Sequence, residues 1–355
     1  MPERVMIVAG GTGGHIYPAL AVAEILVREG VGLRWLGARG GMEERLVARH
    51  GIALDTLRVS GLRGRGPMGW LLAPIMVATA TLQAIAAIRR FKPGVVLGMG
   101  GFVSGPGGLA AFLCRRPLVI HEQNAVAGLT NRVLSRLATR VLQAYPGCFG
   151  GRGIETGNPV RAAIAALADT PRLPPQGRAV RLLIVGGSRG ARRLNEVLPA
   201  AMASGAHTAF EVWHQTGEAG LAATRAAYAS HGIAARVDAF IDDMPAAYGW
   251  ADLVVCRSGA MTLAEVTAAG LPSVLVPFPH AVDDHQTANA RHLDDAEAAV
   301  LVPESVLAPL SLSDLLRSLA ADPTRLAEMG QRARRLARPD AAASVAAHCL
   351  ELLRA

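Results

Sequence analysis

Residues 5–18, VMIVAGGTGGHIYP, begin as a short apolar run and then break into a turn that contains four glycines, a threonine and a histidine. A run of β-branched and apolar residues before a glycine-rich turn is typical of a strand that leads into a helix. Such a turn exposes backbone N–H groups at the helix N-terminus, where they can hold a phosphate. The stretch therefore predicts the strand, turn and helix of a parallel α/β sheet.

The helix expected after this turn has Pro18 in its first turn and Gly30 at its end. Its apolar residues recur every three or four positions, so they share one face that would pack on the sheet. These residues are Ala19, Val22, Ala23, Leu26 and Val27.

Further apolar runs alternate with longer helical stretches along the whole chain, which indicates repeated βαβ units. The strands expected after the first are residues 33–36, 95–97, 118–120, 182–185, 253–255 and 274–276. Residues 181–191, RLLIVGGSRGA, repeat the pattern of the opening turn half a chain later. Residues 168–178, rich in proline and polar groups, precede this repeat as a linker or an early loop of the second half. We therefore expect two similar α/β domains that face each other across a cleft.

The composition limits the possible partners and cofactors. The 355 residues are 51% hydrophobic, enough for two cores, and carry a net charge of +8. Only 4% are aromatic and no stretch interleaves them with basic residues, so nucleic-acid binding is not expected. Four widely separated cysteines without metal-ligand spacing suit a reducing compartment and a protein without a metal site. The short apolar run before the glycines is too brief for a secretory signal.

The residues of the opening turn exclude two common phosphate-binding motifs, the dinucleotide-binding fingerprint and the Walker A loop. In the dinucleotide-binding frame GxGxxG, counted from Gly11, Ile16 occupies the place of the third glycine. A Walker A loop needs a Gly-Lys pair, but the only lysine is Lys92, which follows Phe91. The sequence has three adjacent aspartate pairs but no Asp-x-Asp, so we expect neither a bound cofactor nor a metal ion.

Residues 66–88 contain no charged side chain, although Arg65 precedes them and Arg89 follows. The segment is long enough to span a bilayer, but Pro67, Pro74 and its many small or polar residues argue against a transmembrane helix. We expect a crossover helix that packs on the sheet.

The larger apolar residues of this segment support two alternatives. Four of them form a stripe at helical spacing, as in a packed helix: Leu71, Ile75, Leu82 and Ile85. Another set forms an apolar tip near several arginines, as in a peripheral membrane contact: Trp70, Leu71, Leu72 and Met76.

Taken together, the motifs resemble one family, the MurG-type glycosyltransferases of peptidoglycan synthesis. The matching stretches are GGTGGHIYP (10–18), SGLRGRG (60–66), GMGGFVSGPGG (98–108), HEQNAVAGLTN (121–131), GNPVR (157–161), GGSRGA (186–191), FIDDM (240–244), CRSGAMTLAE (256–265) and HQTANA (285–290). They cover nearly the whole chain. Phe102, where a tyrosine is common, and Arg189 are minor departures from the pattern.

The resemblance implies an α/β fold of the GT-B type, with two Rossmann-like parallel-sheet domains. It implies an acceptor- and membrane-facing domain over residues 1–160, a UDP-GlcNAc-binding domain over 161–337, and a last helix, 338–355, that packs back on the first domain. The activity implied is an inverting transfer of N-acetylglucosamine (GlcNAc) from UDP-GlcNAc to the C4 hydroxyl of N-acetylmuramic acid in lipid I, which gives lipid II and UDP.

The substrate-binding residues that the resemblance implies lie in both halves. Glu265 would accept the ribose hydroxyls, Ile241 would meet uracil beside Phe240, Gln286 would contact the sugar, and Ser188 would contact the diphosphate. The others are Thr12, Gly13, Gly14, Asn124, Arg161, Met261, Thr262, Leu263 and Ala264.

The candidate general base is His15, because an imidazole titrates near neutral pH and lies here at a strand end. His121, Glu122 and His285 are rival candidates.

The implied partners are UDP-GlcNAc, lipid I, the cytoplasmic face of the inner membrane as a peripheral contact, and other cell-wall synthesis proteins. Two other classes stay open: another GT-B enzyme that uses UDP-GlcNAc, such as a lipid glycosyltransferase or a 2-epimerase, and a non-enzymatic basic protein that binds membranes or nucleic acid.

Overall fold

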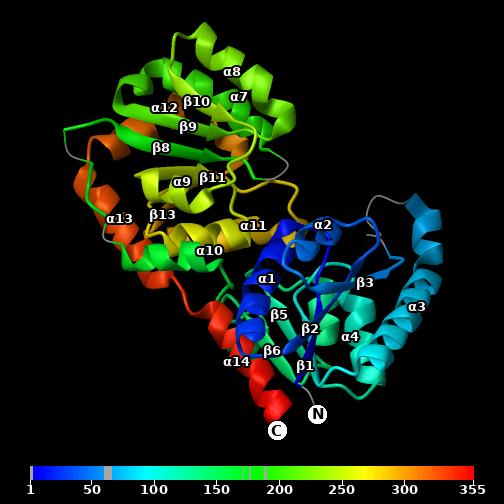
Figure 1. Ribbon diagram of the computed structural model, residues 1–355. Coiled ribbons are helices and arrows are strands. Elements are labelled where there is room, and N and C mark those ends of the chain that lie inside the picture. Colours follow the sequence, from blue (N-terminus) through cyan, green and yellow to red (C-terminus); the bar gives the residue numbers. More distant parts are fainter. Residues whose placement is uncertain (1–2, 60–65, 171, 176, 188–189) are drawn as a thin grey trace. The chain divides into compact units, whose positions relative to one another are not determined.

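The computed structural model describes residues 3–59, 66–170, 172–175, 177–187 and 190–355, with side chains from residue 73 onward in the helix that begins at Gly66. The chain divides into two compact units, Met1–Arg161 with Asp340–Ala355, and Ala162–Pro339. Each is an α/β unit around its own sheet (Figure 1).

The described part of the first unit forms a seven-stranded parallel sheet with the order β3-β2-β1-β4-β5-β6-β7. Its strands are β1 (Arg4–Val8), β2 (Gly32–Ala38), β3 (Ala53–Leu57), β4 (Val95–Gly98), β5 (Leu118–Glu122), β6 (Arg140–Gln143) and β7 (Gly153–Glu155). Its helices are α1 (Gly13–Arg28), α2 (Met42–Ala48), α3 (Gly66–Phe91), α4 (Ser104–Leu113), α5 (Leu129–Leu134), the short η1 (Gly150–Arg152) and α14 (Ala341–Arg354).

Both faces of this sheet are covered, as the apolar composition of β1 requires. Side chains alternate along a strand, so Val5 and Ile7 face one side and Met6 and Val8 the other. The first pair packs with α1 and α14, and the second packs with α3 and α4. Figure 1 shows α14 (red) alongside α1 (dark blue).

The first helix differs from the expectation in the place of Pro18 and in the exposure of Val27. It begins at Gly13, because Thr12 is the extended N-cap residue, so Pro18 lies beyond the first turn, where its missing N–H interrupts the helical ladder. Val27 is 53% exposed although Leu20, on the same side of the helix, is buried. Leu26 beside it is fully buried, so Val27 lies at the margin of the packed face. Gly30 has a φ of +78° and ends the helix as expected.

The uncharged segment forms α3, which packs on α4 and β3 as a crossover helix. The expected packed stripe is only partly correct. Ile85 packs against the sheet, but Ile75 and Leu82 are 65% and 67% exposed, and Ala80, Ala84 and Ile88 face the sheet instead. The side chains of Trp70, Leu71 and Leu72 lie outside the described residues. Small alanines let the helix lie close to the sheet, and this arrangement turns the larger residues outward. No helix within the described residues has the length and hydropathy needed to cross a bilayer.

The described part of the second unit forms a six-stranded parallel sheet with the order β10-β9-β8-β11-β12-β13. Its strands are β8 (Val180–Val185), β9 (Phe210–Gln215), β10 (Ala235–Asp238), β11 (Leu253–Cys256), β12 (Ser273–Leu275) and β13 (Ala299–Leu301). Its α-helices are α6 (Ala162–Ala165), α7 (Arg192–Ala201), α8 (Leu221–Ser230), α9 (Met244–Trp250), α10 (Ala260–Ala268), α11 (His285–Asp294), α12 (Pro309–Ala320) and α13 (Pro323–Leu336). Short helical turns are η2 (Ala166–Asp169), η3 (Met202–Ala206), η4 (His207–Ala209), η5 (Glu218–Gly220), η6 (Val282–Asp284) and η7 (Glu304–Val306).

The proline-rich stretch before β8 belongs to the second unit, so it is an early loop of that unit and not a linker between the two. Arg172 anchors it by donating hydrogen bonds to the carbonyls of Ala251 and Ala269, both at 2.5 Å, and of Tyr248. These carbonyls lie at the C-terminal ends of α9 and α10, where a cation is favourable. Burial and the neighbouring Arg334 lower the pKa of Arg172 to about 10.

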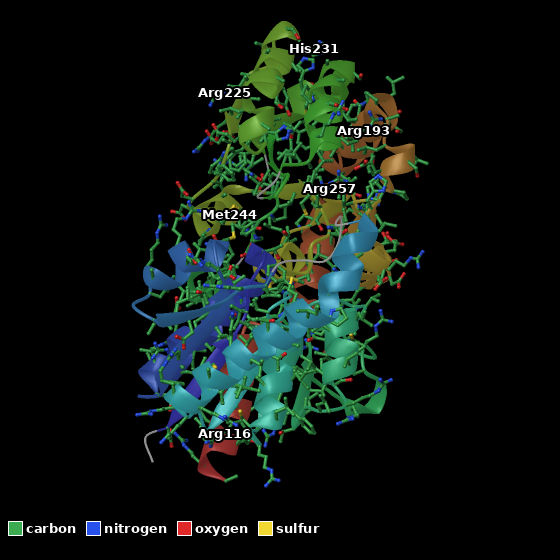
Figure 2. All side chains as sticks on the ribbon, turned by 90° about the vertical axis from the view of Figure 1, so that its right-hand side faces the viewer. Arg116, Arg193, Arg225, His231, Met244 and Arg257 are labelled. Carbon is green, nitrogen blue, oxygen red and sulfur yellow. The ribbon has the colours of Figure 1, made fainter. Side chains whose placement is uncertain are left out.

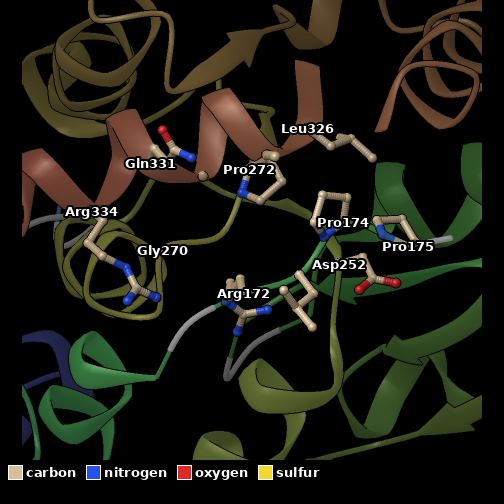
Figure 3. Close-up of a pocket in the computed structure, with 12 residues that line it drawn as sticks. Arg172, Pro174, Pro175, Asp252, Gly270, Pro272, Leu326, Gln331 and Arg334 are labelled. Carbon is tan, nitrogen blue, oxygen red and sulfur yellow. The ribbon is translucent and has the colours of Figure 1, made fainter. Parts of the chain in front are cut away.

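A small pocket of about 250 Å³ lies beside this early loop and is lined by Arg172 and Arg334 among others. Figure 3 shows both side chains. Arg334 donates to the carbonyls of Ala168, at 2.5 Å, and of Thr170, at 2.9 Å. Both guanidinium groups thus donate hydrogen bonds to backbone carbonyls. The two arginines that line this pocket therefore hold the early loop of the second unit in place.

Candidate active site

The glycine turns after β1 and β4 meet at the carboxyl edge of the first sheet. Gly101 has a φ of +82°, and a Cβ there would lie 2.0 Å from the carbonyl oxygen of Gly10. Only glycine allows this approach of two backbones. The contact joins the opening turn to the GMGG turn, as ligand sites at the carboxyl ends of parallel strands require.

His15 lies in the first turn of α1, beside this junction. A Cβ on Gly100 would lie 2.5 Å from His15 Nδ1, so the glycine makes room for the imidazole ring. The same Nδ1 lies 3.2 Å from Oε1 of Gln123, the residue that follows β5. The imidazole is therefore held between two strand ends and is partly exposed.

Glu122, one rival for the base, is a buried structural carboxylate. Its Oε1 accepts hydrogen bonds from the backbone and side-chain amides of Asn124, both at 3.1 Å. Its Oε2 accepts from the Gly128 N–H at 3.2 Å and from Asn131 Nδ2 at 2.9 Å. Because the carboxylate accepts these four hydrogen bonds, it stabilises the conformation of the loop after β5.

His121, the second rival, is fully buried and bonds at both ring nitrogens. Nε2 lies 2.9 Å from the carbonyl of Gly157, and Nδ1 lies 3.2 Å from Gln123 Nε2. Burial lowers the pKa of His121 to about 4, so the ring is neutral at pH 7. Neither His121 nor Glu122 is placed to take a proton from a substrate.

The other expected residues of the first half lie at the same sheet edge. Thr12, Gly13 and Gly14 begin α1, and their positions leave backbone N–H groups at a helix N-terminus. Asn124 is held by Glu122 as described above. Arg161 lies over the ring of Tyr17, with 5.6 Å from its Cζ to the ring centroid, two residues beyond His15 in the chain.

In the second unit, the turn after β8 is tied to its neighbour β9. The side chain of Gln215 accepts a hydrogen bond from the Gly187 N–H at 3.1 Å and donates to the Gly187 and Ala239 carbonyls at 3.1 and 3.0 Å. Gly187 has a φ of +80°, which favours glycine. Ser188, expected to contact the diphosphate, lies outside the described residues.

Helix α10 follows β11 and begins after Gly259, an N-cap without a side chain to satisfy the first N–H groups. Met261, Thr262 and Ala264 are partly exposed on it. Leu263 is different: its side chain is 1% exposed, and its N–H donates to the Gly259 carbonyl at 3.0 Å. Its side chain and its N–H are therefore both used inside the unit, and substrate binding at Leu263 stays a prediction.

Glu265 lies further along the same helix and receives a hydrogen bond from a buried tyrosine. Tyr248, on α9, donates from its hydroxyl to Glu265 Oε2 at 3.0 Å. Tyr248 is 1% exposed, whereas Glu265 is partly exposed. The tyrosine thus fixes one carboxylate oxygen from the protein interior.

The remaining expected residues lie at the ends of β10 and β12. Ile241 is partly exposed and follows Phe240, which is 51% exposed after β10. Gln286 accepts a hydrogen bond at Oε1 from the Phe278 N–H at 2.9 Å, so its Oε1 is used in the loop after β12. His285, the third rival base, lies on α11, with Nδ1 2.7 Å from the Val282 carbonyl.

Three residues that the sequence did not single out contribute to the candidate sites: Gln123 in the first unit, and Tyr248 and Arg257 in the second. Arg257 (labelled in Figure 2) follows β11, donates to the Val276 and Pro277 carbonyls at 3.2 and 3.1 Å, and forms an ion pair with Glu304. Gln123 and Arg257 stand inside the stretches HEQN and CRSGAMTLAE, which was the available signal. Within the described residues, no three His, Cys, Asp or Glu side chains gather as a metal site would need.

The sequence matches one glycosyltransferase family in both units. The Glycosyltransferase family 28 N-terminal domain matches residues 5–143, and the Glycosyltransferase family 28 C-terminal domain matches residues 181–345. The first range covers strands β1 to β6 and ends before β7, and the second covers strands β8 to β13.

Curated relatives match over almost the full length. The chain is 54% identical over 354 residues to a protein of Alkalilimnicola ehrlichii, covering 99% of both chains, and 51% identical to one of Marinobacter nauticus, covering 98% and 97%. Both relatives are named UDP-N-acetylglucosamine–N-acetylmuramyl-(pentapeptide) pyrophosphoryl-undecaprenol N-acetylglucosamine transferase. Among solved structures, Acinetobacter baumannii MurG is similar with a TM-score of 0.83 and 40% identity, covering 99% of this chain and 100% of that one.

Proposed function

The chain belongs to glycosyltransferase family 28, in its MurG group, and from this premise we propose that it transfers GlcNAc from UDP-GlcNAc to lipid I and forms lipid II and UDP. The observation that carries the proposal is an identity of 51–55% with the transferases of that name over both units.

The second unit is proposed to bind the donor. Glu265 has a carboxylate that can accept two neighbouring ribose hydroxyls, and Tyr248 holds one of its oxygens in place. Ile241 would meet uracil, with exposed Phe240 beside it, and Gln286 would contact the sugar. The N-terminus of α10, with Met261, Thr262, Leu263 and Ala264, would stabilise the charge that develops on the diphosphate as UDP leaves. Ser188 is proposed to add a hydroxyl donor there.

The first unit is proposed to bind the acceptor and to supply the base. The N–H groups at Thr12, Gly13 and Gly14 suit the lipid I diphosphate, and Asn124 and Arg161 lie at the same edge. His15 is proposed to remove the proton from the C4 hydroxyl of N-acetylmuramic acid. That oxygen then attacks the anomeric carbon of GlcNAc as its bond to the UDP oxygen breaks, which inverts the centre.

The acceptor carries a long lipid, so we propose a peripheral contact with the cytoplasmic face of the inner membrane. The surface concerned is the α3–α4 patch, which we define as Ile75, Leu82, Phe112 and Leu113, each at least 50% exposed. It borders an apolar groove of about 740 Å³ between these helices. Exposed Arg89 and Arg115 lie at the C-terminal ends of α3 and α4. Their positive charges would be attracted to anionic lipid headgroups. Other cell-wall synthesis proteins are proposed partners at the same membrane face.

The purified protein, incubated with UDP-GlcNAc and a lipid I analogue, tests the activity. The expected products are UDP and a disaccharide-bearing lipid in equal amounts. UDP release without a disaccharide would indicate another UDP-GlcNAc enzyme, and no reaction would contradict the proposal.

A further inference from the structure

The side chain of Gln123 lies between His15 and His121, and its orientation is fixed by the groups around it. Its Nε2 lies 2.9 Å from the carbonyl oxygen of Met99. A carbonyl only accepts hydrogen bonds, so the amide nitrogen must face Met99. The amide oxygen Oε1 therefore faces His15 Nδ1, at 3.2 Å.

His121 fixes the same orientation independently. Its Nε2 faces the Gly157 carbonyl at 2.9 Å and so carries the ring proton. Burial keeps the ring neutral, which leaves a lone pair on Nδ1. That lone pair accepts the second amide hydrogen of Gln123, at 3.2 Å. Both hydrogens of the amide are thus used, and Oε1 must be an acceptor.

The orientation of Gln123 decides the protonation of its other neighbour. Because Oε1 cannot donate, His15 Nδ1 must carry a hydrogen to make the 3.2 Å contact. We propose that Gln123 is a positioning residue that holds neutral His15 as the Nδ1–H tautomer, with the lone pair on Nε2. A chain of hydrogen bonds from Gly157 through His121 and Gln123 then sets the tautomer of His15.

This tautomer is the one that a general base at His15 needs. Nδ1 faces Gly100 and Gln123, inside the unit, whereas Nε2 is the ring nitrogen on the opposite side. The catalytic consequence depends on the proposed base role of His15, but the tautomer itself depends only on the geometry of the first unit.

The tautomer can be measured in the full chain without any substitution. Long-range ¹H–¹⁵N NMR of histidine-labelled protein, with His15 identified by its loss in His15→Gln, distinguishes a protonated from an unprotonated ring nitrogen. At a pH where His15 is neutral, we expect a protonated Nδ1 and an unprotonated Nε2. The Nε2–H tautomer would overturn the proposal, even if the protein makes lipid II.

The Gln123→Met variant tests the consequence for catalysis. It keeps the length of the side chain but loses the amide, so His15 should no longer be held as Nδ1–H. We expect kcat to fall at least about tenfold, part of the 10²–10⁴-fold that general base catalysis contributes, with the KM for UDP-GlcNAc within about twofold.

Gln143→Met is the matched control. Gln143 is also a buried glutamine at a strand end of this unit, and its Oε1 accepts from the Phe149 N–H at 3.0 Å. Its loss should reduce stability while leaving kcat and the His15 tautomer unchanged. Equal losses of kcat in the two variants, or full kcat in Gln123→Met, would overturn the proposal. A wild-type protein that binds both substrates without forming lipid II would instead contradict the proposed function.

Discussion

Replacing Ile75 and Leu82 with glutamine should weaken binding to anionic membranes strongly. Both side chains lie on the outer side of α3 and are 65% and 67% exposed, so glutamine can replace them without opening a cavity in the core. Glutamine also has a good helix propensity, so α3 should persist.

The magnitude follows from the exposed apolar surface. Full burial of a leucine or isoleucine side chain contributes about 1.5–3 kcal/mol, so two-thirds of each side chain represents about 1–2 kcal/mol. Loss of both contributions, about 2–4 kcal/mol, corresponds to a decrease in partitioning of roughly 30- to 700-fold if both side chains enter the bilayer fully. Because insertion at an interface is shallower, we expect at least about tenfold.

Sedimentation with vesicles that contain an anionic phospholipid measures this partitioning. Leu310→Gln is the matched control, since Leu310 is 70% exposed on α12 of the second unit and outside the α3–α4 patch. It should leave vesicle binding unchanged, and the double variant should keep the wild-type Kd for UDP-GlcNAc. Vesicle binding equal to that of the wild type would refute the membrane role of this patch.

Three further predictions concern the two sites and the buried histidines. His15→Ala should lower kcat by about 10²–10⁴-fold in a UDP-release assay with little change in donor Kd, and near-normal turnover would exclude the base role. Tyr248→Phe removes a hydrogen bond to Glu265 that is worth about 0.5–1.5 kcal/mol, so the Kd of UDP measured by calorimetry should rise about 2- to 10-fold. If the Kd of 2′-deoxy-UDP rises by the same factor, Glu265 does not bind the ribose hydroxyls. His121 and His214 are buried, and burial lowers their pKa values to about 4 and about 3. As the pH falls below 6.5, these histidines therefore take up protons in the unfolded chain before they do so in the folded protein. Each should then reduce the free energy of unfolding by about 2 kcal/mol between pH 7 and pH 5 in chemical denaturation, and constant stability would contradict this.

The strands could be predicted because parallel strands buried on both faces need continuous apolar runs. The runs at residues 5–8 and 182–185 became β1 and β8, the strands that precede the two similar glycine turns. The carboxyl edges of both sheets then followed from the order of strand, turn and helix, and expected residues of each half, such as His15 and Glu265, lie on the helices that follow these edges.

The direction of side chains on α3 could not be predicted in the same way. Helical spacing shows that Ile75 and Leu82 can share a face, but not whether that face turns to the sheet. Close packing of alanines decided it: Ala80 and Ala84 lie against the sheet because they are small. Hydrophobicity alone favoured the larger residues for the core.

The hydrogen-bond partner of the candidate base His15 could not be predicted from the sequence either. Gln123 contacts His15, Met99 and His121, and two of these belong to other βα units of the first sheet. Tyr248 similarly reaches Glu265 from a different helix. Contacts of this kind depend on the packing of whole elements, and no local pattern encodes them.

Transfer of GlcNAc to lipid I can be measured in a product assay with the purified full chain. Radiolabelled UDP-GlcNAc and a lipid I analogue should give a labelled disaccharide lipid in the same molar amount as UDP, without an added metal ion. Absence of the disaccharide lipid, with the protein folded and both substrates bound, would contradict the proposed transferase activity.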